Sequence, residues 1–161
     1  MTGSEGPDLR LAQRIALAVP ALLLAGAYVS QYVFDLYPCE MCLWQRWPHF
    51  AALALALLSF VVPPKNWLVA LAAGGILTSA AIGGFHAGVE YGWWEGVTSC
   101  TAIPEVGSGQ SALDAIMDAP LIRCDEAPWD LFGISLAGYN FLISAAAGLA
   151  IFTLLLKERR A

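Results

Sequence analysis

WLVALAAGGILTSAAIGGFHAGV, residues 67–89, is the stretch that decides the fold. It contains no Asp, Glu, Lys or Arg, and about 20 apolar residues suffice for a helix to cross roughly 30 Å of hydrocarbon. Three further apolar stretches of similar length are Ile15–Phe34, Leu43–Val62 and Gly133–Leu156. The whole chain is 58% hydrophobic and only 13% charged, with a mean hydropathy of +0.64. These values exclude an ordinary soluble domain and predict an integral membrane protein.

The continuous apolar runs also predict the kind of secondary structure. Lipid offers the backbone no hydrogen-bond partner, so a crossing segment must be a helix or part of a closed barrel. Runs without polar alternation favour helices. We therefore expect an all-α membrane protein, a four-transmembrane-helix bundle that forms a single domain over residues 1–161. The first stretch exceeds the usual core of a signal peptide and ends without a small-residue cleavage motif, so we interpret it as retained.

The distribution of Lys and Arg predicts the orientation in the membrane. Four crossings place both termini on one side, and six of the eight basic residues fall there: Arg10, Arg14, Lys65, Lys157, Arg159 and Arg160. Because basic residues concentrate on the inner side, we expect cytoplasmic termini. The loops at residues 35–46 and 90–131 then face outward. This predicts a multi-pass protein of a bacterial inner membrane with two periplasmic loops.

The second outward loop is acidic and contains a candidate helix. Eight of the thirteen Asp and Glu residues lie between Glu90 and Asp130, which argues against nucleic-acid binding. They form either a solvated loop or a docking patch. Within this loop, Gln110–Ala119 places apolar and acidic side chains on different helical faces. We expect a short helix on the membrane surface there; a loop packed onto the bundle is the alternative.

All four cysteines fall in the two outward loops, where disulfides persist. Cys39 and Cys42 are separated by two residues, which suits redox exchange. Cys100 and Cys124 are separated by twenty-three residues, and such a pair can be structural or exchangeable. Zinc sites built from four cysteines commonly use two closely spaced pairs and rarely occur in an oxidising compartment. We therefore expect no metal.

The residues around the close pair predict a reactive thiol. Pro38 suits the first turn of a helix, so Cys39 would lie near a helix N-terminus, where a thiolate is favoured. Arg46 follows Cys42 by four residues and would share its helical face. Its permanent charge could stabilise a thiolate or a reduced acceptor, or it could reach lipid head groups. Pro48 removes a helical hydrogen bond and suggests two separate helical pieces.

Several motifs together resemble a known family. They are the Cys-x-x-Cys pair followed by Gln45-Arg46, the segment FHAGVEYG at 85–92, Cys100, and CDEAPW at 124–129 followed by Gly133-Ile134-Ser135. In this combination the chain resembles the DsbB-type disulfide-bond formation proteins over nearly its whole length. These are membrane enzymes that use quinone to reoxidise a periplasmic DsbA-type thiol oxidase. The resemblance implies ubiquinone or menaquinone as a non-covalent acceptor.

The resemblance also implies roles for individual residues. Cys39 and Cys42 would form the quinone-facing disulfide, with Cys42 as the thiolate that meets the quinone ring. Cys100 would be attacked by the partner's thiolate to give a mixed disulfide. Cys124 would pair transiently with Cys39, and Arg46 would lie near the quinone.

His86 matches a family histidine near the same site. An ionisable residue near the outer end of an apolar stretch is a functional candidate, and its imidazole could hydrogen-bond a quinone carbonyl or deliver a proton. The alternative is a histidine that only contacts a neighbouring helix or head group. His49 lacks such support, and we expect it at the membrane interface. Five glycines of the third stretch would let another helix approach closely: Gly74, Gly75, Gly83, Gly84 and Gly88.

Two alternative functions follow from the same residues. The protein could be a close relative dedicated to one specific client oxidase, because partner choice resides in loop surfaces that one sequence does not rank. It could also be a non-enzymatic membrane scaffold held by two inert disulfides. The second alternative does not explain why Arg46 follows the close cysteine pair, because an inert disulfide needs no charge to stabilise a thiolate.

Overall fold

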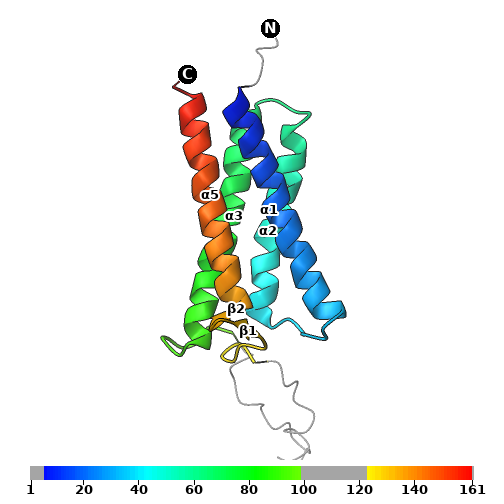
Figure 1. The fold of residues 1–161 in the computed structure, drawn as a ribbon, viewed down its shortest axis with the longest axis vertical. Coiled ribbons are helices and arrows are strands. Elements are labelled where there is room, and N and C mark those ends of the chain that lie inside the picture. The colour runs from blue at the N-terminus through cyan, green and yellow to red at the C-terminus, as the bar shows by residue number, and fades with distance from the viewer. Residues whose placement is uncertain (1–5, 99–122, 161) are drawn as a thin grey trace, which may run out of the picture.

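The computed structural model describes residues 6–98 and 123–160, which form four long helices with a short hairpin at one end (Figure 1). The elements are α1 (Pro7–Tyr32), α2 (Glu40–Ser59), α3 (Lys65–Glu90), β1 (Asp130–Leu131), β2 (Ile134–Ser135) and α5 (Leu136–Glu158). The start of α1 and the end of α5 lie together at the end of the bundle opposite the hairpin (Figure 1). There the Gly6 amide donates a hydrogen bond of 3.0 Å to Glu158 Oε1.

Small residues let the helices pack closely. Helix α3 packs extensively against both α2 and α5, and a Cβ added at Gly75 would lie only 3.0 Å from the Pro48 carbonyl oxygen. Between membrane helices such close contact, rather than expulsion from water, provides much of the attraction. The core facing the terminal end is accordingly rich in alanine and includes Ala12, Ala16, Ala52, Ala56, Val69, Ala72, Ala73, Ile76 and Ile151.

Three helices in the described part of the chain, α1, α3 and α5, are long and apolar enough to cross a membrane. The all-α membrane class is thereby supported. Helix α2 has 20 residues, about 30 Å at 1.5 Å per residue, but its first half carries Gln45, Arg46 and His49. The fourth crossing therefore stays a prediction.

The helix ends differ from the predicted apolar stretches. Helix α1 begins at Pro7 rather than at residue 15, because Arg10 and Arg14 are good helix formers that continue the helix beyond its apolar part. The stretch at 67–89 lies within α3 and is nearly identical to it. Apolar length thus locates the part of a helix that lipid can cover, while helices extend past it into water.

Helix α2 begins at Glu40 with Cys39 as its N-cap, which confirms the expected helix N-terminus near Cys39. The outward position of residues 35–46 stays a prediction. The expected break at Pro48 was wrong, because α2 continues through it. Ser79 Oγ of α3 donates a 2.9 Å hydrogen bond to the Gln45 carbonyl oxygen, in the turn before Pro48. This bond ties α3 to the α2 backbone beside the proline.

Helix α5 begins at Leu136, three residues later than the predicted Gly133. Phe132 and Gly133 have φ angles of 53° and 75° and turn the chain between β1 and β2. Ser135 then caps α5, since its side chain accepts a 3.1 Å hydrogen bond from the Gly138 amide. The expected surface helix at 110–119 and Cys100 lie outside the described residues.

Candidate active site at the start of helix α2

The Cys39–Cys42 pair lies at the N-terminus of α2. Cys39 is the N-cap residue, with extended backbone angles, and its sulfur accepts a 3.3 Å hydrogen bond from the Cys42 amide. Cys42 lies in the first helical turn. Both cysteines are free thiols, with their sulfur atoms 2.9 Å apart. The structure therefore shows the reduced form of a pair that can close with little movement of the backbone.

The surroundings of Cys39 favour its thiolate. A hydrogen bond from the Cys42 thiol lowers the pKa of Cys39 most strongly, burial opposes this, and a hydrogen bond from His86 lowers it further. The resulting pKa is about 5, against an ordinary value of 9.0. At neutral pH such a cysteine is ionised, and the thiolate is the reactive form in disulfide exchange.

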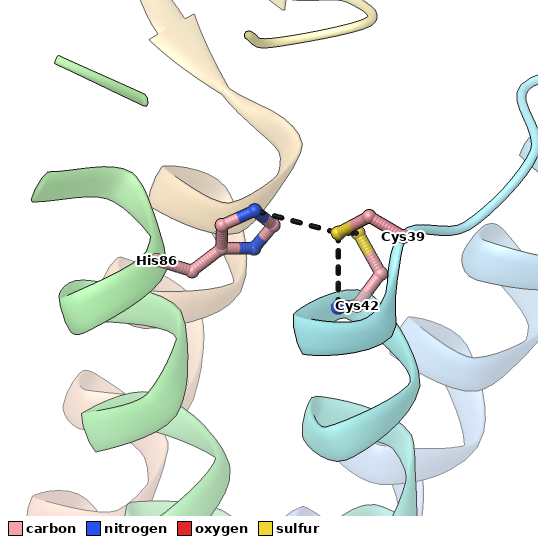
Figure 2. A group of neighbouring side chains, drawn as sticks. All are labelled: Cys39, Cys42 and His86. Carbon is pink, nitrogen blue, oxygen red and sulfur yellow. Dashed lines mark hydrogen bonds between the residues drawn. The ribbon is translucent and has the colours of Figure 1, made fainter. Parts of the chain in front are cut away.

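His86 approaches the pair from α3, on the opposite side of the site (Figure 2). Its Nε2 lies 3.5 Å from Cys39 Sγ and 3.7 Å from Glu90 Oε1. Gln45 Nε2 lies 2.9 Å from the other ring nitrogen, Nδ1. Because an amide nitrogen can only donate, Nδ1 accepts and the ring proton resides on Nε2. His86 therefore directs an N–H towards the Cys39 sulfur and the Glu90 carboxylate, which in turn accepts a hydrogen bond from Ser135 Oγ.

Two cavities meet at Cys42. An outer cavity of about 660 Å³ is lined by both cysteines and by charged or polar side chains that include Asp35, His86, Glu90 and Arg123. We call the second one, of about 230 Å³, the inner cavity. Its walls come from α1, α2 and α5, the loop at 36–38 and Pro128, and they include Leu23, Arg46 and Asn140. Cys42 lines both cavities, whereas Cys39 lines only the outer one.

Arg46 lies in the wall of the inner cavity, one turn below Cys42. Its Nη1 donates a 2.7 Å hydrogen bond to Gln31 Oε1, and its Nη2 lies 3.5 Å from the Ala27 carbonyl oxygen. The guanidinium also lies 5.0 Å from the centre of the Tyr28 ring. Helix α1 thus holds this charge beside the cavity. The predicted role of Arg46 near an acceptor suits this position and stays a prediction.

The second cysteine pair is described in part. Cys124 is disulfide-bonded, and its partner lies outside the described residues. Cys124 is fully buried in a cluster with Cys39, Met41 and Val89. The cluster places Cys124 beside Cys39. The exchange between these two residues stays a prediction.

A metal could also be held at this site. One ligand atom each of Cys39, Cys42 and His86 lies within 4.8 Å of the others. Two thiolates and an imidazole are ligands that zinc prefers. The expectation that the protein works without a metal is untested and stays a prediction.

Sequence reasoning missed a buried polar network beneath the pair. His49 is 3% exposed inside the bundle, so its expected place at the interface was wrong. It hydrogen-bonds Asn140 of α5, which in turn bonds Gln45. Polar residues at helical spacing along an apolar stretch could have indicated this network. Its partners could not be paired without the helix packing.

The fold and the site together define a class: helical membrane proteins whose reactive group is a cysteine pair at the end of the bundle. The chain belongs to the DsbB family, because the family described as "Disulfide bond formation protein DsbB" matches residues 10–154. It is a disulfide oxidoreductase of the membrane.

Individual relatives agree with this assignment. The chain is 32% identical to disulfide bond formation protein B of Verminephrobacter eiseniae, over 94% of this chain and 88% of the relative. It is 30% identical to the protein of the same name in Polaromonas naphthalenivorans, over 94% and 93%. An uncharacterised protein of Rickettsia prowazekii is 25% identical, over 81% and 78%. No solved structure matches the chain.

Proposed function

We propose that this protein reoxidises a periplasmic dithiol protein of the DsbA type and transfers the electron pair to a quinone of the bacterial inner membrane. The position of Cys42 carries the proposal. This cysteine lines both the polar outer cavity, where a protein thiol can be received, and the inner cavity against α1 and α5. A thiol at such a boundary can pass electrons from a water-soluble donor to a lipid-soluble acceptor.

The residues of the inner cavity fit a quinone. Its walls are largely apolar, and Cys42, Arg46 and Asn140 are among the residues that line it. Apolar walls with a few placed polar groups are typical of small-molecule sites. A bound quinone supplies an acceptor for two electrons and two protons. Arg46 would attract the electron-rich reduced ring, since its charge is permanent.

In the proposed sequence, disulfide exchange begins at the second cysteine pair. The partner's thiolate attacks Cys100 Sγ, which breaks a Cys100–Cys124 disulfide and releases the Cys124 thiolate. Cys124 then attacks Cys39 Sγ in the oxidised close pair, and the electron pair of the broken bond leaves on Cys42. The partner's second thiolate attacks the partner sulfur of the mixed disulfide. It leaves oxidised and frees the Cys100 thiolate.

The remaining exchange restores the second pair. Cys100 attacks Cys124, which re-forms their disulfide and releases Cys39 as a thiolate. A low pKa makes Cys39 a good leaving group, and the Cys42 and His86 hydrogen bonds provide it. The close pair is then reduced, as in the structure. Its two electrons leave through Cys42 into the inner cavity, the two thiol protons are given up, and the Cys39–Cys42 disulfide re-forms.

The test combines two variants with two reductants, with quinone reduction followed by absorbance. Cys42→Ser should abolish quinone reduction whether the electrons come from a reduced DsbA-type protein or from dithiothreitol. Cys124→Ser should block the protein donor but keep the reaction with dithiothreitol, a small molecule that can reduce the close pair directly. Sustained quinone reduction by Cys42→Ser would refute the proposal.

A further inference from the structure

Gln45 connects the cysteine site to the polar network beneath it. Gln45 and Arg46 are neighbours, but a helix turns by about 100° per residue, so their side chains point in different directions. Arg46 reaches Gln31 of α1. Gln45 is 7% exposed, and its Nε2 lies 2.9 Å from His86 Nδ1 in α3. The proposed electron path uses Arg46 and gives Gln45 no role.

The neighbours of the Gln45 amide determine which of its atoms is the nitrogen. Its Nε2 donates a 3.2 Å hydrogen bond to the Met41 carbonyl oxygen, an atom that can only accept. Its Oε1 accepts a 2.7 Å hydrogen bond from Asn140 Nδ2. A reversed amide would place an oxygen against the Met41 carbonyl oxygen and a nitrogen against Asn140 Nδ2. Both bonds would be lost, so the nitrogen of Gln45 faces His86.

Asn140 is held in one orientation in the same way. Its Nδ2 also lies 3.3 Å from the Ser79 carbonyl oxygen and 3.1 Å from Ser79 Oγ. That hydroxyl gives its own proton to the Gln45 carbonyl oxygen and is therefore an acceptor for Asn140. Asn140 Oδ1 accepts a 3.0 Å hydrogen bond from Ser144 Oγ. A reversed Asn140 would bring its oxygen against the Ser79 carbonyl oxygen, so Nδ2 remains the group that faces Gln45.

The Gln45 hydrogen bond fixes the His86 ring. Because Nδ1 accepts from Gln45, the proton of the neutral ring lies on Nε2. Nε2 lies 3.5 Å from Cys39 Sγ and 3.7 Å from Glu90 Oε1. A half turn of the ring would exchange each nitrogen with a ring carbon. Gln45 Nε2 would then face a C–H group, and Cys39 would lose the N–H. The bond to Gln45 therefore opposes this rotation.

We propose that Gln45, oriented by Asn140, is a positioning residue for Cys39, because it keeps the His86 N–H directed at the Cys39 sulfur and so stabilises the Cys39 thiolate. The effect is exerted through His86. This inference goes beyond the proposed function, since it concerns only the cysteine pair and does not depend on which acceptor takes the electrons.

A stabilised thiolate affects one step of the exchange and one equilibrium. A thiol of low pKa leaves faster in disulfide exchange, and in the proposed sequence Cys39 leaves as a thiolate when Cys100 attacks Cys124. Stabilisation of this thiolate also favours the reduced pair over its disulfide. Gln45 thus makes the Cys39–Cys42 disulfide a stronger oxidant.

Three substitutions in the network test the proposal. Gln45→Met keeps the length of the side chain and removes both of its polar atoms. Asn140→Leu removes the hydrogen bond to Gln45 Oε1 and leaves the Met41 carbonyl to orient the amide. Ser144→Ala is the matched control, because it removes a hydrogen bond on the other side of Asn140 and leaves those to Gln45 and Ser79. Thermal unfolding in detergent micelles identifies the variants that retain the wild-type fold.

The measurement is the equilibrium constant for reduction of the close pair at neutral pH, from equilibration with dithiothreitol redox buffers. Full-length, quinone-free protein is used in a Cys100→Ser, Cys124→Ser background, so that the close pair contains the remaining cysteines. Thiolate absorbance gives the pKa of Cys39 in the same samples. The other ionisable residues that line the outer cavity are unchanged in every variant: Asp35, Cys42, Glu90, Arg123 and Glu126.

The expected effects are graded. His86→Ala should lower the equilibrium constant by about 10-fold or more, the loss expected for a hydrogen bond to a charged group. Gln45→Met should lower it by about 3-fold or more, up to the effect of His86→Ala. Asn140→Leu should have a smaller effect than Gln45→Met, and Ser144→Ala should have none. The pKa of Cys39 should rise in the same order.

A double variant, Gln45→Met with His86→Ala, shows whether Gln45 acts through His86. If it does, the double variant matches His86→Ala, because the residue that transmits the effect is gone. A full further loss in that background would overturn the inference, and so would an unchanged equilibrium constant in folded Gln45→Met. Either result would leave the proposed transfer to quinone standing. Failure of wild-type protein to reduce quinone would overturn the proposed function without changing this measurement.

Discussion

Cys39 is the residue on which the chemistry of the close pair depends. Its pKa of about 5 lies below the ordinary value of 9.0. The thiolate therefore stabilises the folded, reduced protein fully above about pH 9, and this contribution is lost as the pH falls through about 5. The same preference for the thiolate stabilises the reduced pair over its disulfide, which makes the pair a stronger oxidant of Cys124 and its partners.

The first prediction concerns the titration of Cys39. In a Cys100→Ser, Cys124→Ser background, ultraviolet thiolate absorbance should show a transition near pH 5 that disappears in Cys39→Ser. Cys42→Ala should move this transition towards the ordinary thiol range, because it removes the largest contribution to the low pKa. His86→Ala should move it in the same direction by less. A wild-type transition in the ordinary range would show that the hydrogen bonds do not stabilise the thiolate.

The second prediction concerns Arg46, whose charge is held beside the inner cavity by α1. Arg46→Met keeps the length of the side chain and removes the charge, and we expect the KM for quinone to rise by about 10-fold or more, as for loss of a charge-assisted interaction. Gln31→Leu should raise KM by less, since it removes only the 2.7 Å hydrogen bond that positions the guanidinium. Steady-state quinone reduction with dithiothreitol measures both. An unchanged KM in Arg46→Met would leave Arg46 as an anchor to lipid head groups.

At the scale of elements, α3 determines how closely the bundle packs beside the site. A Cβ at Gly83 would lie 2.9 Å from Asn140 Nδ2, 3.0 Å from the Ala137 carbonyl oxygen and 3.1 Å from Gln45 Oε1. Gly83 is thus the place where α3 makes room for the polar network. At Gly74, in the same helix, an added Cβ would have no other atom within 4 Å.

The third prediction uses these two glycines as a matched pair. Gly83→Ala should destabilise the protein by about 1–3 kcal/mol through overpacking and should disturb the hydrogen bonds of Gln45 and Asn140. Gly74→Ala should be neutral or stabilise by about 0.5–1 kcal/mol, because alanine is the better helix former. Chemical unfolding in micelles measures both. Equal effects of the two substitutions would mean that α3 and α5 are farther apart at Gly83.

The sequence predicted the helices better than their ends, for a physical reason. Apolar length reports where lipid can cover a helix, so the stretch at 67–89 located α3 almost completely. The start of α5 depends instead on the turn at Phe132–Gly133 and the Ser135 cap, which involve backbone angles rather than hydropathy. The expected helix break at Pro48 did not occur, since α2 continues through this proline.

For the site, the sequence predicted the residues with distinctive chemistry but not their connections. The spacing of Cys39 and Cys42 and the depth of His86 singled out these three, and the structure brings them together. His49 was misplaced because a histidine near Trp47 and Pro48 has the same sequence context at an interface as inside a bundle. Its burial follows only from the packing of α2 against α5.

At the scale of the whole molecule, the two ends of the bundle differ in the residues that they carry. Cys39, Cys42 and Cys124 cluster at the end of the bundle that carries the two cavities. The hairpin lies at this end, and the start of α1 and the end of α5 lie at the other (Figure 1). Six of the eight basic residues fall at or near the end with the termini. If that end faces the cytoplasm, the thiols face the compartment in which disulfides persist.

The fourth prediction tests this orientation with reporter fusions. Green fluorescent protein fused after Ala161 should fluoresce, because it folds in the cytoplasm, whereas alkaline phosphatase at the same position should be inactive, because its disulfides form only after export. Fusions truncated after Glu95, just beyond α3, should give the opposite pair of results. If the N-terminus is cytoplasmic and α2 does not cross the membrane, the end of α3 lies in the cytoplasm and the end of α5 lies outside, so both reporter results are reversed. Fluorescence at Ala161 and phosphatase activity at Glu95 are therefore expected, because α3 carries the chain outward and α5 carries it back. Phosphatase activity at Ala161 would contradict this topology, on which the proposed electron path depends.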